Sequence, residues 1–283
     1  MMAQAVSPQI DSGWMPFSFA KPEIPLIVFE VKANGSALKL NLDTGNADSL
    51  FLSEASAKRL DLTMKPTKGE KDTRDSVGND FIPSLFDSKI KELKVGSIQR
   101  KNVTVRVSNF VDILAKNLSI EIDGNIGYKF LKDFCVQVDY PRSRLRFSPS
   151  GSAILGSVPF ELGKSPWIIV TAQINQSKPA KFILDTGASS SVLDPSFVKS
   201  HGIVGTEEIP MMGATGMITA HMAHQVSISV GKRKVDGLDV AIADIVSPLS
   251  ESAGIELSGV IGYDFLKGSL VSIDYPKKRI GFK

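Results

Sequence analysis

The sequence predicts an all-β protein built as two tandem lobes. With 283 residues, the chain is long enough for two domains that each bury a core. Its apolar residues fall in short runs, many of them rich in β-branched residues, which is typical of strands. The same series of motifs occurs twice, over residues 15–147 and again over residues 158–282. A repeat of this length indicates two lobes of one plan.

Each repeat begins with a predicted β hairpin. Residues 24–31 and 165–172 are the outgoing strands. An Asn-Gly pair at 34–35 marks the turn in the first copy, and residues 175–178 take that place in the second. Both return strands are apolar and end in Asp-Thr-Gly. Short helices are expected next, over residues 53–60 and 194–201.

The second part of each repeat supports the same division. An Ile-Gly pair recurs in both halves, and each half closes on a strand, a proline turn and a strand. The small and polar composition after residue 148 is typical of a linker. The predicted organisation is a flexible segment 1–13, an N-terminal lobe 14–148, a linker 149–156 and a C-terminal lobe 157–283.

Composition excludes several classes of protein. The net charge is +3 with 22% charged residues, which is too little to indicate a nucleic-acid partner. No apolar run reaches the roughly 18 residues that a membrane span needs. Cys135 is the single cysteine, so no intrachain disulfide is possible. Residues 1–13 lack the basic and apolar regions of an intact secretory signal.

The duplication places one carboxylate, Asp43 or Asp185, at the end of a buried strand in each half. Two carboxylates held close together cannot both ionise easily, so the pair shares a proton over a range of pH. One group can then take a proton from an attacking water while the other protonates a carbonyl oxygen. This chemistry needs no metal and no cofactor, and we expect neither.

These motifs resemble those of the aspartic peptidases. Two Asp-Thr-Gly triplets, each after an apolar strand and each followed downstream by Ile-Gly, cover nearly the whole chain from residue 15 to residue 282. The second triplet is similar to the retroviral motif, and the short halves resemble bacterial single-chain relatives. The resemblance implies a bilobal all-β fold of two retropepsin-like β-barrel lobes with short helices. It implies a catalytic pair, Asp43 and Asp185, with loop support from Thr44, Gly45, Asn46, Ile126, Gly127, Thr186, Gly187, Ala188, Ile261 and Gly262.

The family also closes β-hairpin flaps over its substrate. The glycine-rich stretch at 212–217 is the expected flap tip of the second lobe, and residues 75–79 are its counterpart in the first. No equivalent of the pepsin flap tyrosine is visible. The expected flap and substrate-binding residues are Val77, Gly78, Met212, Gly213, Ala214, Thr215 and Gly216.

The residues after the triplets depart from the family pattern. Asn46 replaces the usual small residue, but its amide can still hydrogen-bond a carboxylate. Ala188 cannot donate a hydrogen bond to Asp185. We therefore expect a pH optimum less acidic than that of pepsin-like enzymes.

Two other hypotheses, a second acidic pair and a metal site, are less favoured. Asp139 and Asp274 lie in a repeated Asp-Tyr-Pro and fit turn residues at strand ends better than a second acidic pair. His221 and His224 are three apart in a predicted strand and so face opposite sides, which argues against a metal site.

The sequence therefore predicts an aspartic endopeptidase whose partner is an extended peptide or protein substrate bound between the lobes. The alternative is a catalytically weak or inactive relative that binds peptides. A monomer is expected because the two lobes already supply both acids. The resemblance and the single cysteine favour a secreted or periplasmic bacterial location over a cytoplasmic one.

Overall fold

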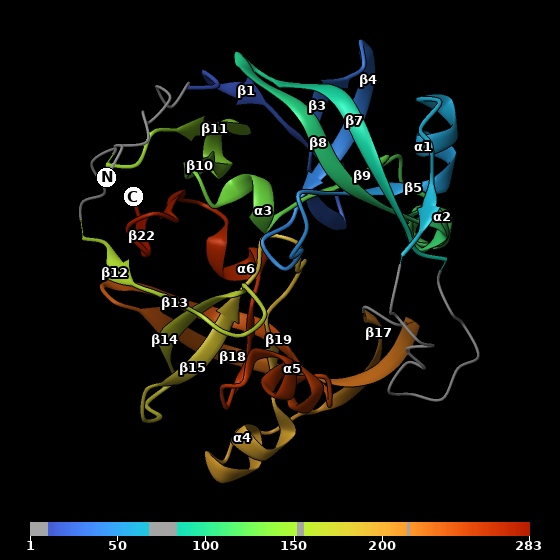
Figure 1. Cartoon of the computed structure of the whole chain (residues 1–283). Helices are drawn as coiled ribbons and strands as arrows, with labels where there is room; N and C mark the ends of the chain where they lie inside the picture. The colour runs from blue at the N-terminus through green and yellow to red at the C-terminus, as the bar shows by residue number, and fades with distance from the viewer. Residues whose placement is uncertain (1–10, 68–83, 152–155, 214–215) are drawn as a thin grey trace.

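The predicted all-β, two-lobed fold is confirmed. The structure is a computed structural model, and it describes residues 11–67, 84–151, 156–213 and 216–283. Two eight-stranded sheets, one from each half of the chain, are joined by a six-stranded sheet to which both halves contribute. In Figure 1 the first lobe occupies the upper right, the second lobe lies below it, and the shared sheet runs down the left side.

The first lobe is a closed barrel. Its strand order is β2-β3-β4-β9-β5-β8-β7-β6, and a further pairing of β3 with β7 closes the ring. Three short helices accompany these strands. The strands in sheet order are β2 (Ser18–Lys21), β3 (Ile24–Ala33), β4 (Ser36–Leu42), β9 (Gly124–Ile126), β5 (Leu50–Ser53), β8 (Ile98–Ser108), β7 (Phe86–Val95) and β6 (Lys65–Pro66), and the helices are α1 (Glu54–Arg59), α2 (Asn109–Leu118) and α3 (Tyr128–Leu131).

The second lobe repeats this order strand for strand. The sequence β13-β14-β15-β20-β16-β19-β18-β17 is closed by the pairing of β14 with β18. Its elements are β13 (Glu161–Leu162), β14 (Ile168–Ile174), β15 (Ala180–Leu184), β20 (Gly259–Ile261), β16 (Val192–Leu193), β19 (Arg233–Ile242), β18 (Gly216–Val230), β17 (Glu207–Gly213), α4 (Pro195–Ser200), α5 (Val246–Ala253) and α6 (Tyr263–Leu266).

The shared sheet fixes one lobe against the other. Its central strands, one from each half, pair antiparallel with Gln137 opposite Ser272, which are equivalent positions of the two repeats. The lobes are thus related by an approximate twofold axis through this pair, and one apolar core runs through both. The sheet consists of β1 (Met15–Pro16), β11 (Arg144–Ser148), β10 (Cys135–Asp139), β21 (Leu270–Asp274), β22 (Arg279–Phe282) and β12 (Val158–Pro159), with a 3-10 turn at Tyr140–Arg142.

Local chemistry explains the elements that the sequence predicts. Asn34 and Gly35 both have positive φ, as the tight turn between β3 and β4 requires. Ser53 caps α1 by accepting from the amide of Ser56, and Asp194 caps α4 with Pro195 in its first turn. Asp139 and Asp274 lie at opposite ends of the β10–β21 pair and do not face each other.

Described parts of the N-terminal segment and of the expected linker are hydrogen-bonded to the shared sheet. Of the segment 1–13 the structure describes residues 11–13, where Ser12 is buried and its N–H donates to the Phe147 carbonyl at 2.8 Å. In the expected linker, Ser150 and Gly151 both donate to the Asp274 carboxylate.

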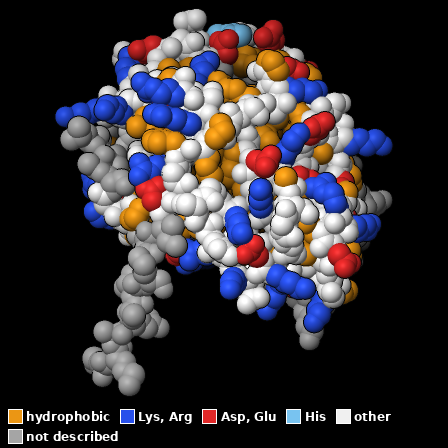
Figure 2. Space-filling view, turned by 90° about the horizontal axis from the view of Figure 1, so that it is seen from above, with side chains coloured by type: hydrophobic (Ala, Val, Ile, Leu, Met, Phe, Trp, Pro, Cys, Tyr) orange, Lys and Arg blue, Asp and Glu red, His pale blue; other side chains and the backbone are white. Residues whose placement is uncertain are grey.

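The surface is of mixed charge. On the face shown in Figure 2, Lys and Arg side chains lie among acidic ones, with hydrophobic side chains exposed between them. Within the described part of the chain, no helix has the length and apolar character needed to traverse a bilayer.

Candidate active site

The two Asp-Thr-Gly triplets follow directly on the buried strands β4 and β15. Each strand lies parallel to a short strand that ends in the Ile-Gly pair, β9 in the first lobe and β20 in the second. The amide of Asp43 donates to the carbonyl of Ile126, and that of Asp185 to the carbonyl of Ile261, at 3.1 and 2.9 Å. Because both isoleucines are fully buried, each aspartate starts from a rigid strand end.

The threonines of the triplets lock the two loops together across the lobes. Thr44 Oγ1 donates to the carbonyl of Leu184 and accepts from the amide of Thr186. Thr186 Oγ1 donates to the carbonyl of Leu42 and accepts from the amide of Thr44. All four distances are 2.9–3.2 Å, and both side chains are buried. The loops therefore meet as one rigid unit.

This lock brings the two aspartates to one point. The amide of Gly45 donates to Asp43 Oδ1 at 2.9 Å and to Asp185 Oδ1 at 3.1 Å, so a single N–H is shared by both carboxylates. The amide of Gly187 donates to Asp185 Oδ1 at 2.8 Å. A Cβ at Gly45 would lie 2.8 Å from Asp185 Oδ2, and one at Gly187 would lie 2.8 Å from Asp43 Oδ1. Only glycine lets the carboxylates approach this closely.

The surroundings of Asp43 and Asp185 disfavour ionisation of both carboxyl groups. Burial, and then the negative charge of Asp185, raise the pKa of Asp43 to about 7. Burial also raises the pKa of Asp185, against the lowering effect of hydrogen bonds from the amides of Gly187 and Gly45. Since two like charges oppose each other here, the pair holds one proton through the mildly acidic range.

Asn125, a residue of β9, contributes a side-chain donor to the pair. Its Nδ2 donates to Asp43 Oδ2 at 2.8 Å, on the oxygen that the Gly45 amide does not contact. The side chain of Asn46 instead accepts from the amide of Asp48 through Oδ1. At the position of Asn125, the second lobe has Val260, which cannot donate. The two carboxylates are therefore chemically unequal.

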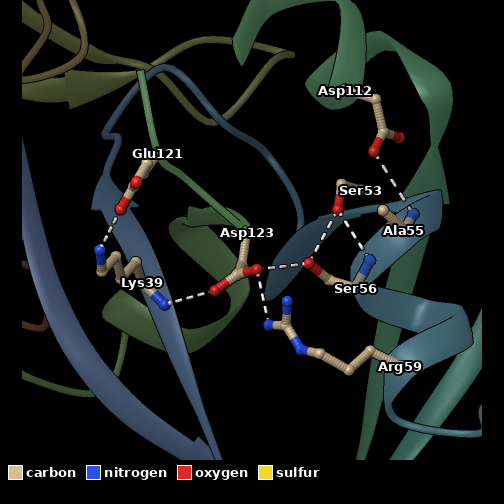
Figure 3. Close-up of polar contacts among 8 residues, drawn as sticks. All are labelled: Lys39, Ser53, Ala55, Ser56, Arg59, Asp112, Glu121 and Asp123. Carbon is tan, nitrogen blue, oxygen red and sulfur yellow. Dashed lines mark hydrogen bonds and ion pairs between the residues drawn. The ribbon is translucent and has the colours of Figure 1, made fainter. Parts of the chain in front are cut away.

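The strand that bears Asn125 is anchored by a polar network around Asp123, shown in Figure 3. Asp123 accepts from the amide of Lys39 on β4, at 2.7 Å. It also accepts from Ser56 Oγ and Arg59 Nη2 on α1, at 2.6 and 2.7 Å. One carboxylate thus ties the strand leading to Asp43, the helix after it and the segment leading to Asn125.

An indole from the opposite lobe also reaches the first loop. Trp167 Nε1 donates to the carbonyl of Gly45 at 2.8 Å. This side chain precedes β14 and packs against an apolar cluster of the second lobe that includes Val246, Ala253 and Leu257. In the first lobe the equivalent residue is Leu26, so no matching contact is made to the second loop.

The Ile-Gly pairs lie behind the loops. The amide of Gly127 donates to the carbonyl of Ser49, and a Cβ at Gly127 would lie 2.4 Å from the carbonyl oxygen of Asn46. A Cβ at Gly262 would lie 2.6 Å from the carbonyl oxygen of Ser190 and 2.8 Å from that of Ala188. Close backbone contact therefore requires glycine at both positions.

The expected second flap lies at the end of a β hairpin. Strands β17 and β18 pair up to Gly213 opposite Gly216, with Met212 opposite Met217. Met217 is 60% exposed, and the adjacent pair of the hairpin, Met211 and Ile218, packs on an apolar cluster of the second lobe. Ala214 and Thr215, and the expected first-lobe flap residues Val77 and Gly78, lie outside the described residues.

Sequence reasoning missed Asn125 and Trp167 as members of this site. Aligning the two repeats gives a signal for both residues, because each has a side-chain hydrogen-bond donor where the other repeat has an aliphatic residue. Asn125 aligns with Val260, and Trp167 aligns with Leu26. Neither position belongs to the triplets.

Fold and site together define a two-lobed β protein with a paired-carboxylate centre at the lobe interface. Comparison with protein families gives the same result. A family model described as "Aspartyl protease" matches residues 29–130 and 170–265, one region in each lobe, and the chain belongs to this family. A search of curated proteins found no match.

Proposed function

We propose that the protein is an aspartic endopeptidase in which Asp43 and Asp185 activate water for attack on a peptide bond. The observation that supports this most strongly is the Gly45 amide shared by Oδ1 of both carboxylates. Such a contact holds the two acids close enough to share one proton and to address one water molecule.

The unequal surroundings assign a role to each acid. Asp185 Oδ1 accepts from the amides of Gly45 and Gly187, and these hydrogen bonds favour its ionised form. Burial and the Asp185 charge raise the pKa of Asp43 although Gly45, Asn46 and Asn125 also donate to it, and we assign the shared proton to Asp43. In the proposed mechanism, Asp185 takes a proton from the attacking water and Asp43 donates its proton to the carbonyl oxygen.

As the C–N bond of the tetrahedral species breaks, Asp185 would give the proton taken from water to the leaving amine, and Asp43 would take back its proton from the hydroxyl that becomes the product carbonyl. No covalent intermediate and no metal is required. The remaining donors fix the carboxylates in advance, which lowers the cost of reorganisation during the reaction.

The proposed substrate is an extended peptide that lies between the lobes and under the hairpin of β17 and β18. Strand-like main-chain hydrogen bonds would hold it in register. Met217 and its apolar neighbours at the hairpin favour hydrophobic side chains in the substrate. Because the pKa of Asp43 is near 7, we expect activity in mildly acidic to neutral buffer rather than in strong acid.

The test is cleavage of a mixed peptide library from acidic to neutral pH, with the Asp185→Asn variant in parallel. Cleavage by the parent protein alone, at sites flanked by hydrophobic residues, is the expected result. Equal cleavage by both proteins would refute the proposal, because the variant lacks the base. Binding of peptides by both proteins with no cleavage by either would refute the enzymatic role and indicate a peptide-binding protein.

A further inference from the structure

We infer that Trp167 is a positioning residue through which the second lobe sets the geometry of the first lobe's acid. The inference rests on the proposed function. It concerns an interlobe contact that lies outside both Asp-Thr-Gly triplets.

The contact is made to Gly45, the residue whose amide both carboxylates share. The Gly45 amide donates to both carboxylates, and the Gly45 carbonyl accepts from Trp167 Nε1. Both polar groups of this residue are therefore fixed, one by the aspartates and the other by the indole. A change in the indole position would move the shared N–H and alter the spacing of the two acids.

The indole is itself held firmly. Its ring packs against the cluster formed by α5 and its neighbours, including Val246 and Leu257. The segment leading to it is fastened to the end of α5, because the amides of Lys164 and Ser165 donate to the carbonyls of Ala253 and Ser252. Trp167 thus connects the α5 region of the second lobe to the catalytic loop of the first.

This connection exists on one side only. The equivalent residue of the first lobe is Leu26, which is buried against α2 and has no side-chain donor. The contact therefore acts on Asp43 and its loop without a counterpart at Asp185. It adds to the inequality of the two acids that Asn125 creates.

The first test reads the contact directly and needs no turnover. The chain has two tryptophans, so a ¹⁵N-tryptophan-labelled sample gives two indole N–H signals, which the Trp14→Phe variant assigns. Trp14 is a matched control because it is 36% exposed and stacks over the Arg144 guanidinium, away from the loops. We expect the Trp167 proton to exchange with solvent at least about tenfold more slowly than that of Trp14. Its shift should move with pH as the pair titrates, and this movement should be lost in Asp43→Asn.

The second test uses activity. Trp167→Phe keeps the aromatic packing and removes the donor, so we expect kcat to fall roughly tenfold with KM little changed and the pH profile displaced. Trp14→Phe should match the parent. An indole proton at Trp167 that exchanges as fast as that of Trp14, or that ignores titration of the pair, would overturn the inference. An unchanged kcat and pH profile in Trp167→Phe would do the same. If the parent cleaves nothing, the labelled sample still decides the inference, while the proposed function alone fails.

Discussion

Replacing Asn125 with valine should raise the pH at which the aspartate pair loses its shared proton. Valine is the residue that the second lobe carries at the equivalent strand position, so β9 should accept it without distortion. The change removes the donor to Asp43 Oδ2, at 2.8 Å, and leaves the Gly45 amide on Oδ1 in place.

The size of the shift follows from the kind of hydrogen bond that is lost. A hydrogen bond to an ionised group contributes about 1.5–3 kcal/mol, and one pKa unit corresponds to about 1.36 kcal/mol. Since Asn125 favours the ionised form of Asp43, its loss should raise the pKa from about 7 by roughly one to two units. The direction is upward because the protonated form of Asp43 does not need this donor.

The assay is the pH dependence of kcat/KM on a peptide selected from the library. The alkaline limb of the profile should move to higher pH, and kcat should fall because Asp43 loses its side-chain donor. The titration of the Asp43 carboxyl carbon, followed by NMR, should show the same shift without requiring turnover.

Asn46→Ala is the matched control. The Asn46 side chain accepts from the amide of Asp48 and makes no hydrogen bond to Asp43, so its removal should leave the alkaline limb in place. If Asn125→Val superimposes on the parent profile, or if Asn46→Ala moves the limb equally, the assignment of Asn125 as the tuning residue is wrong.

Three further outcomes follow from the same geometry. Thr44→Val should lower the free energy of unfolding by about 2–4 kcal/mol in denaturant titration, because the Leu184 carbonyl and the Thr186 amide lose their buried partner, and Thr44→Ser should retain most of it. Asp123→Ala should cost about 2–3 kcal/mol in the same measurement, whereas removal of the exposed Glu121 partner of Lys39 should leave the stability nearly unchanged. Folded Asp43 keeps a proton that the unfolded chain releases above a pKa of 3.8, so stability should fall by up to about 4 kcal/mol as pH rises from about 4 to about 7, and Asp43→Asn should lack that part of the loss.

The sequence was informative where function depends on local pattern. An apolar strand followed by Asp-Thr-Gly, present twice, predicts the lobes, the hairpins and the meeting of the two loops. These features follow from the hydrophobic periodicity, the turn residues and the internal repeat, all of which can be observed in a single sequence. The helices α2 and α5 were not predicted, although α2 has a capping serine, Ser108, and apolar residues at helical spacing.

The partners of the acids could not be predicted in the same way. Asn46 is adjacent to the first triplet, and the sequence analysis noted that its side chain can hydrogen-bond the carboxylate. The structure assigns that contact to Asn125, which is 82 residues from Asp43 and reaches it because β9 lies parallel to β4. Trp167 is 122 residues from Gly45 and belongs to the other lobe. Such contacts depend on strand register and lobe packing, which the local sequence does not specify.

The two repeats differ in the side-chain donors that contact the loop of Asp43. The triplet glycines and threonines of both halves supply backbone and hydroxyl donors, and the Gly45 amide adds a contact to Asp185. The donors without a counterpart, Asn125 and Trp167, both act on the loop of Asp43. A symmetric pair of acids would have no preferred site for its proton, whereas a reaction that needs one acid and one base benefits from such a preference. Asn125 allows the ionisation of Asp43 to be adjusted while the Gly187 amide holds Asp185, whereas Trp167 acts through Gly45, whose amide both acids share.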